Sequence, residues 1–328
     1  MRCARRRSSS VVLQALCAAA LAGACPAFAQ DFPTKPVRII PVGGGEPLIR
    51  LLGQKFTESW GQQIVVDDRP GAAGIIAGQY VARSAPDGYT LLMATTTFVI
   101  TPNFYKVPFD ILKDFTPIAV VAQVPFVLVA HPSLPVRSVA DLVKLAKARP
   151  GDITFSAASP GSPAALVGEL FKHAAGVNLL HVPYKALPAA LMDVVAGQIQ
   201  LGFTVAPLAI PQVQSKRVRM LAIASRERSA VLPDTPTFTE AGYPAVVATG
   251  WYALVAPAGT PAAIVNRINA EVERALKIAE MRQRILTLGM DIVGSSPAEC
   301  AAFLRAEYAK WAQFIKAANV RIDTSAGP

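Results

Sequence analysis

The chain has 328 residues, a formal net charge of +10 and 52% hydrophobic residues. A chain of this length can bury about three quarters of its unfolded surface, usually as two domains, and therefore needs no disulfide framework. Its basic residues are scattered. Because no basic stripe with interleaved aromatic residues is present, the sequence argues against nucleic-acid binding.

Residues 1–29 have the pattern of a secretory signal peptide. Four arginines lie between positions 2 and 7, an apolar run covers Val11–Ala22, and Ala27–Ala29 gives a small-x-small cleavage pattern before Gln30. We therefore expect a cleavable signal and a periplasmic protein. A membrane anchor is the alternative, but the apolar run is shorter than the roughly 20 residues that span a bilayer. Lipid attachment at Cys25 is a second alternative and stays open.

Cleavage would change the composition of the mature chain. Four arginines and three cysteines are lost, which leaves 28 basic against 22 acidic residues, a net charge of +6, and Cys300 as the remaining cysteine. An internal disulfide is then excluded, and the mildly basic overall field favours anionic ligands.

Short β-rich runs alternate with helical periodicity, which predicts an α/β fold with mostly parallel sheets. In the first part of the chain, the first predicted elements are a strand at 37–40 and a helix with Leu48, Leu51, Leu52 and Phe56 on its apolar face. A strand at 63–66, a helix that follows 68–74 and ends near 86–88, and a strand at 89–93 come next.

A long apolar, β-branched segment at 117–130, broken by Pro125, is interpreted as a crossover between lobes. A second series then follows, with helices at 139–148, around 166–171 and up to Gly197, and strands at 153–155, 179–182, 201–203 and 218–223. A strand at 251–256 and two further helices return to the first part. We predict a discontinuous lobe 1 (30–125 and 246–328) and a lobe 2 (126–245).

Two loops suit an anion. Gly43, Gly44 and Gly45 lie between a strand and a helix, where open backbone N–H groups favour negative charge. Their spacing fits neither a phosphate-binding loop nor a dinucleotide fingerprint, and a simple tight turn is the alternative. The second loop, Ser156–Pro163, also precedes a helix, with Ser162 as N-cap and Pro163 in the first turn. Helix capping alone is its alternative. Together the loops predict a cleft that holds a small carboxylate from both sides.

Catalytic motifs are missing from the sequence. It has three histidines, no His-Glu-x-x-His, no Gly-x-Ser-x-Gly and no Ser-x-x-Lys. We therefore expect neither an enzyme nor a bound metal or cofactor.

Seven segments carry a resemblance to a known family. The chain resembles the periplasmic solute-binding receptors of tripartite tricarboxylate transporters, the Bug-type proteins. The segments are FPTKPVRII (32–40), DRPGAAG (68–74), APDGYTLLMAT (85–95), GELFKHAAGVNLLHVPYK (168–185), VAGQIQLGF (195–203), LPDTPTFTEAGYP (232–244) and WYALVAPAGTP (251–261).

The resemblance implies a two-lobed periplasmic-binding-protein fold of type II with two crossover connections, and a small carboxylated solute between the lobes. The contacts that it implies are Gly43, Gly44, Gly45, Glu46, Thr95, Thr96, Thr97, Ser156, Ser159, Gly161, Ser162, Tyr184, Lys185 and Thr204. For Tyr184 and Lys185 the alternative interpretation is a purely structural role. For Asp193 a structural role is the expected one.

The chain also departs from the family pattern. The glycine loop is two or three residues shorter than usual, and its aspartate is absent, with Glu46 as the nearest carboxylate. An acidic residue at that helix start is stabilised by about 0.3–1 kcal/mol, so Glu46 can occupy the anion site itself or meet a ligand ammonium. Pro160, Thr204 and Thr101 also replace residues common in the family. The identity of the ligand therefore cannot be inferred from that of the relatives.

The function predicted from these observations is a monomeric periplasmic receptor that captures a small organic acid or amino acid for a membrane permease. A sensor or scavenger without its own permease is one alternative. A hydrolase-like enzyme is another, although Ser156, Ser159 and Ser162 have no histidine near them in the sequence to act as a base. A receptor that has lost its ligand is the third.

Overall fold

The computed structural model describes residues 32–322, of which the part from Lys35 onward forms one compact unit. The predicted signal peptide lies outside the described residues. The strands are β1 (Val37–Pro41), β2 (Ile64–Val66), β3 (Thr90–Thr95), β4 (Phe115–Ala130), β5 (Thr154–Ala157), β6 (Leu180–Pro183), β7 (Leu201–Val205), β8 (Arg219–Ile223), β9 (Thr249–Pro257) and β10 (Asp291–Ile292).

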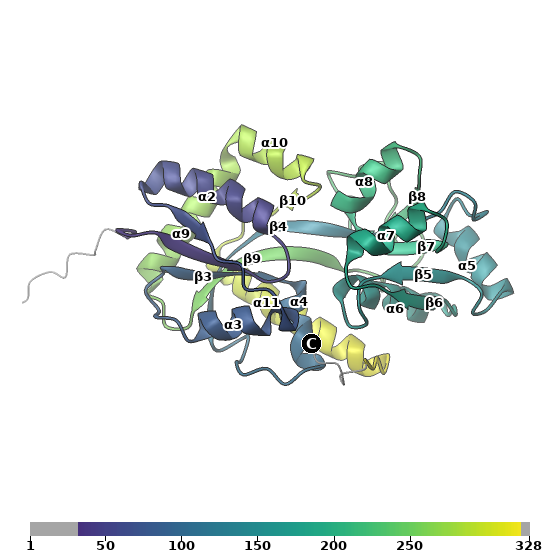
Figure 1. Ribbon diagram of the computed structural model, residues 1–328, viewed down its shortest axis with the longest axis horizontal. Helices are drawn as coiled ribbons and strands as arrows, with labels where there is room; N and C mark the ends of the chain where they lie inside the picture. The colour runs from purple at the N-terminus through teal and green to yellow at the C-terminus, as the bar shows by residue number, and fades with distance from the viewer. Residues whose placement is uncertain (1–31, 323–328) are drawn as a thin grey trace, which may run out of the picture. The chain divides into compact units, whose positions relative to one another are not determined.

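Helices alternate with these strands along most of the chain (Figure 1). They are α2 (Glu46–Trp60), α3 (Ile75–Ala82), α4 (Thr96–Ile100), α5 (Val139–Ala148), α6 (Pro163–Ala175), α7 (Leu187–Val195), α8 (Ala206–Gln214), α9 (Ala262–Lys277), α10 (Ala279–Thr287) and α11 (Pro297–Ala317), with 3₁₀ turns η1 (Ala72–Gly74) and η2 (Thr101–Asn103). The α/β class predicted from the sequence is confirmed.

The strands pair in the order β2-β1-β3-β9-β4-β7-β5-β6, and β8 and β10 also pair with β4. Strand β1 is parallel to β2 and β3, and β5 is parallel to β6 and β7. Every pairing of β4 and β9 is antiparallel. The prediction of mostly parallel sheets is therefore correct for the outer strands and wrong at the centre, where two long strands cross in opposite directions.

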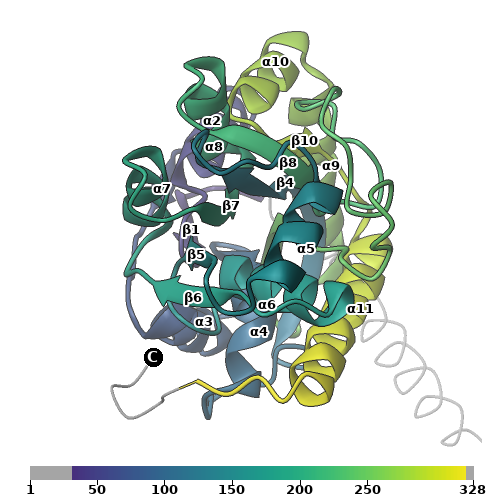
Figure 2. The ribbon, with the colours of Figure 1, turned by 90° about the vertical axis from the view of Figure 1, so that its right-hand side faces the viewer.

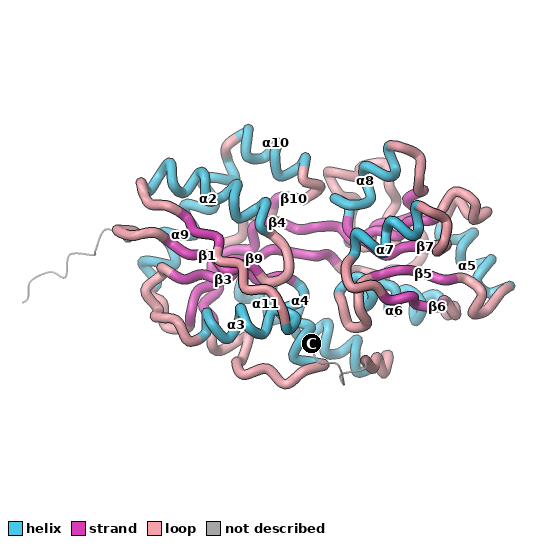
Figure 3. The backbone as a smooth tube through the Cα atoms, viewed as in Figure 1, coloured by secondary structure: helices cyan, strands magenta, loops and turns pink. Residues whose placement is uncertain are grey.

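Strand β4 is shared by two groups of strands. Its residues 115–125 pair with β9, and residues 126–130 pair with β7 and with part of β8. Pro125 lies at the change, which suits a residue that has no N–H to give to a ladder. We call β1, β2, β3 and β10 with their helices the first lobe, and β5–β8 with α5–α8 the second lobe. Figure 3 shows β4 and β9 running between these groups.

The side chains of β4 alternate between two cores in the second lobe. Phe126 and Leu128 belong to the core that includes Phe171 of α6, whereas Val127 and Val129 belong to the core that includes Leu191 of α7. Because neighbouring residues of a strand point to opposite faces, α6 and α7 cover opposite sides of the sheet (Figure 2). Such two-sided burial explains why β4 reads as a continuous apolar run.

Local signals in the sequence agree with the helix ends. Helix α5 has the predicted bounds, and its N-cap Ser138 accepts a hydrogen bond from Asp141 N. Helix α8 is absent from the prediction, because Pro207 and Pro211 both lie in it and an interior proline normally disfavours a helix.

The lobe boundaries at 125/126 and 245/246 stay a prediction.

Candidate ligand-binding site

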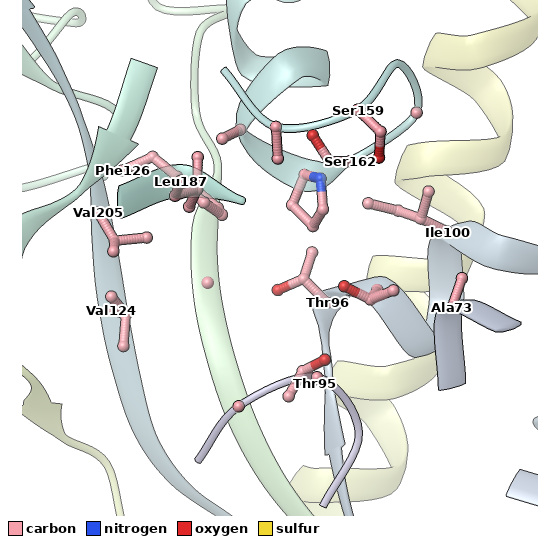
Figure 4. Close-up of a pocket in the computed structure, with 18 of the residues that line it drawn as sticks. Ala73, Thr95, Thr96, Ile100, Val124, Phe126, Ser159, Ser162, Leu187 and Val205 are labelled. Carbon is pink, nitrogen blue, oxygen red and sulfur yellow. The ribbon is translucent and has the colours of Figure 1, made fainter. Parts of the chain in front are cut away.

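A cavity of about 670 Å³ lies between the two lobes. Its wall combines the Gly43–Gly45 turn, the start of α4, the loop between β5 and α6, and residues of β4 and β9. In Figure 4, Ser159 and Ser162 lie on one side of this space and Thr95 and Thr96 on the opposite side. The two loops predicted from the sequence therefore do reach one shared cavity.

The glycine turn is shaped by its backbone. Gly43, Gly44 and Gly45 have φ values of +60°, +104° and +94°, in the region that favours glycine. A Cβ atom on Gly45 would lie 2.9 Å from Cε1 of Tyr252, so the Tyr252 ring packs directly on this residue. Gly45 is also the N-cap of α2, with Pro47 in the first turn. Glycine is required here to bring the turn against Tyr252.

The threonine cluster joins β3 to α4. Thr95 is the last residue of β3, and its Oγ1 donates a hydrogen bond to Val42 O at 3.0 Å, which ties the cluster to the end of β1. Thr96 and Thr97 form the first turn of α4. The hydroxyl of Thr96 is fully buried and has no hydrogen-bond partner. It is an unsatisfied polar group in the cavity wall, a kind of group that native proteins seldom leave unpaired.

The second lobe contributes the start of α6. Ser162 is its N-cap, as predicted, and its Oγ accepts a hydrogen bond from Ala165 N at 3.4 Å. The capping interpretation of Ser162 is thus correct, and the hydroxyl still has a proton to donate. Ser159, which is exposed, and Gly161, with φ +83°, complete this side.

Apolar side chains form another wall of the cavity. Figure 4 shows Val124, Phe126, Leu187 and Val205 gathered on one side, away from Ser159. Trp251, Met290 and Phe104 also line the cavity. A mainly apolar pocket with a few convergent polar groups is the usual form of a small-molecule site.

Lys185 is the only charged residue among the described residues of the wall. Burial raises the pKa of Tyr252, and the nearby negative charge of Glu46 raises it further. The Tyr252 hydroxyl therefore stays protonated near neutral pH and can donate a hydrogen bond into the cavity.

Ten of the predicted contacts lie in the wall: Gly43, Gly44, Gly45, Thr95, Thr96, Thr97, Ser159, Gly161, Ser162 and Lys185. Four do not: Glu46, Ser156, Tyr184 and Thr204. Ser156 Oγ donates to Ala190 O at 2.9 Å beneath α7, and Thr204 is buried with an unpaired hydroxyl.

Tyr184 has an internal partner. Its hydroxyl donates to Asp193 Oδ2 at 2.5 Å. Burial and this carboxylate raise the pKa of Tyr184 to about 12. The structural interpretation of Tyr184 and Asp193 is therefore the one that the contacts favour, and neither residue enters the site.

Sequence reasoning misses the aromatic and aliphatic part of the wall. Phe126, Tyr252, Leu187 and Ile100 lie in it, yet in the sequence they look like ordinary core residues of strands and helices. For Tyr252 alone a signal is present, since the segment 251–261 carries part of the family resemblance.

The groups that could support chemistry lie elsewhere. Within residues 32–322, no three His, Cys, Asp or Glu side chains gather to hold a metal ion. Cys300 is buried in α11, and burial raises its pKa to about 12. His181 stacks on Phe155, with ring centroids 4.8 Å apart, and burial lowers its pKa although the Glu169 charge acts in the opposite direction. No helix of the described chain has the length and apolar character needed to cross a membrane.

Comparisons with known proteins agree with this architecture. The family model described as tripartite tricarboxylate transporter family receptor matches residues 48–320. Protein BugT of Bordetella pertussis is 32% identical over 306 residues, which cover 91% of this chain and 94% of BugT. The UPF0065 protein from the tcbD–tcbE intergenic region of Pseudomonas sp. strain P51 is 34% identical over 290 residues, covering 87% of this chain and 86% of that protein.

Two solved structures are similar over the same range. Rpa4515 of R. palustris, solved with adipate, is 34% identical with a TM-score of 0.79, covering 89% of this chain and 99% of that one. MatC from Rhodopseudomonas palustris, with bound malate, is 29% identical with a TM-score of 0.75, covering 87% and 100%. The fold is that of the periplasmic binding proteins, and the chain belongs to the tripartite tricarboxylate transporter receptor family.

Proposed function

We propose that this chain is a periplasmic receptor that captures a small organic acid in the cavity between its lobes and passes it to a membrane permease. The carboxylate lies between the start of α4 and the start of α6. The carbon chain of the acid lies against Phe126, Val124 and Val205. Family membership and the acids bound by Rpa4515 and MatC support the ligand class.

One observation carries the proposal: the buried Thr96 hydroxyl, in the wall of the cavity, has no hydrogen-bond partner within the protein. A buried polar group without a hydrogen bond costs roughly 1–3 kcal/mol. A carboxylate oxygen is a strong acceptor. The Thr96 hydroxyl has no surface exposed to the cavity, so its side chain would turn to donate to that oxygen, while Ser159 or Ser162 donates from the other lobe. Binding then removes the penalty and joins the lobes through a shared ligand.

Two further observations support a receptor over an enzyme. The described wall contains hydroxyls, open backbone groups and Lys185, but no histidine, cysteine or carboxylate that could act as a base near Ser159 or Ser162. The cavity volume of about 670 Å³ lies in the usual range for small-ligand pockets.

Thermal unfolding with a panel of mono-, di- and tricarboxylates tests the proposal, with the amide of each acid as its matched control. An acid present at about 100 times its dissociation constant adds about 2.7 kcal/mol to the free energy of unfolding, and its amide adds much less. A panel without any stabilising acid contradicts capture, and a new product in the mixture favours the enzyme. Loss of uptake of the best acid in a strain that lacks this gene tests the link to a permease.

A further inference from the structure

Several helices begin at the cavity, and two of them, α2 and α6, differ in the charge of their first turn. Helices α2 and α6 both start with residues of the wall, Gly45 and Pro47 in α2 and Ser162 and Pro163 in α6. Each start carries about half a positive charge from the aligned peptide dipoles. The first turn of α2 contains Glu46, whereas the first turn of α6 contains no acidic residue. The positive end of α2 is therefore compensated, and that of α6 is not.

The Glu46 carboxylate acts on the cavity although it is not part of the wall. Both neighbours of Glu46, Gly45 and Pro47, line the cavity, and Gly45 packs against the ring of Tyr252. The negative charge of Glu46 contributes to the raised pKa of Tyr252. Within the described chain, Glu46 forms no ion pair that would neutralise it.

The second lobe supplies most of the positive charge at the cavity. Lys185, the only charged residue of the described wall, precedes α7 in the second lobe, where the uncompensated start of α6 also lies. A carboxylate is therefore attracted to the second lobe. The part of the ligand that reaches the Gly43–Gly45 turn lies near the Tyr252 hydroxyl and experiences the negative potential of Glu46.

We propose that Glu46 makes this receptor selective for acids with one carboxylate, whose other end, at the Gly43–Gly45 turn, is an uncharged polar group such as a hydroxyl or an amide. The selectivity rests on the proposed capture of an organic acid. At a separation of about 10 Å and an effective dielectric constant of about 20, repulsion between Glu46 and a second carboxylate weakens binding roughly tenfold.

Acids of equal length separate the effect of charge from the effect of size. Calorimetry near neutral pH and at low salt compares adipate with its monoamide and with 6-hydroxyhexanoate, and succinate with succinamate and 4-hydroxybutanoate. In the wild type, the singly charged acids of at least one length bind about tenfold more tightly than the diacid. High salt reduces the difference in affinity between the singly charged acids and the diacid, because screening weakens a charge effect.

Two variants assign the difference to Glu46. In Glu46→Gln the diacid binds more tightly than in the wild type, and the dissociation constants of the diacid and its monoamide differ by less than about threefold. The control Glu58→Gln removes an acid from the same helix, twelve residues and about 18 Å farther along its axis, and keeps the wild-type difference. Unfolding midpoints of all three proteins show whether each is folded.

The outcomes separate this selectivity from the capture itself. Equal affinity for diacids and monoamides in the wild type overturns the selectivity and leaves capture intact. A difference that persists in Glu46→Gln also overturns it. If none of the acids binds, both proposals fail.

Discussion

Gly45→Ala tests whether the glycine turn and Tyr252 form one packed unit. Gly45 has φ +94° and ψ −4°, and an alanine in the left-handed region costs roughly 1–2 kcal/mol. The new Cβ would lie 2.9 Å and 3.0 Å from two ring carbons of Tyr252, so the ring must turn away from its preferred rotamer at a cost of about 0.5–1.5 kcal/mol. We expect a loss of about 2–3 kcal/mol in the free energy of unfolding.

Gly43→Ala is the matched control. Gly43 has φ +60°, and no atom lies within 4 Å of the position that a Cβ would take, so only the backbone cost of roughly 1–2 kcal/mol applies. Urea unfolding of both variants measures the difference. Binding of the best acid should weaken in Gly45→Ala alone, because the displaced Tyr252 ring enters the cavity.

The contact itself is tested by a second substitution. In a Tyr252→Ala background, Gly45→Ala should cost no more than Gly43→Ala, because the ring that it strikes is gone. Equal destabilisation by the two alanine substitutions in the wild-type background, together with unchanged binding, would refute the packing argument.

Two further predictions concern a hydroxyl and an imidazole. Thr96→Val replaces an unpaired buried hydroxyl by a methyl group. Without acid, the free energy of unfolding measured in urea should rise by about 1 kcal/mol, and calorimetry should show weaker acid binding. A lower free energy of unfolding would mean that the hydroxyl has a partner in the free protein. The lowered pKa of His181 means that the unfolded chain binds a proton more readily than the folded one, so stability falls as pH drops below the ordinary value of 6.5. His181→Phe, which keeps a ring against Phe155, should flatten this fall, whereas the exposed His173→Gln should not; identical pH profiles for both variants would contradict the assignment.

Local features of the sequence are enough to predict most elements of the fold. Ser162 followed by Pro163 marks the start of α6, and the apolar spacing of 139–148 gives α5, because capping and periodicity depend on residues within a few positions of each other. The two anion-favouring loops are predictable for the same reason. The helix at Ala206–Gln214 escapes prediction because its stability depends on packing against the sheet, which outweighs the cost of Pro211.

The direction of individual side chains was decided by the tertiary structure. Ser156 is predicted in the second loop but lies in β5, where its hydroxyl faces Ala190, and the hydroxyl of Tyr184 faces Asp193. Along a strand, a shift of one residue reverses the face that a side chain occupies, so proximity in the sequence cannot place a hydroxyl in a cavity.

The sequence by itself determined the class of fold, the family and the two polar loops that meet at the cavity. The apolar wall and the antiparallel centre exist only in the folded chain. Phe126 and Tyr252 are more than a hundred positions apart, and they reach one cavity because β4 and β9 pair across the middle of the sheet. The difference in charge between the starts of α2 and α6 likewise becomes a property of one site only when both helices open onto the same space.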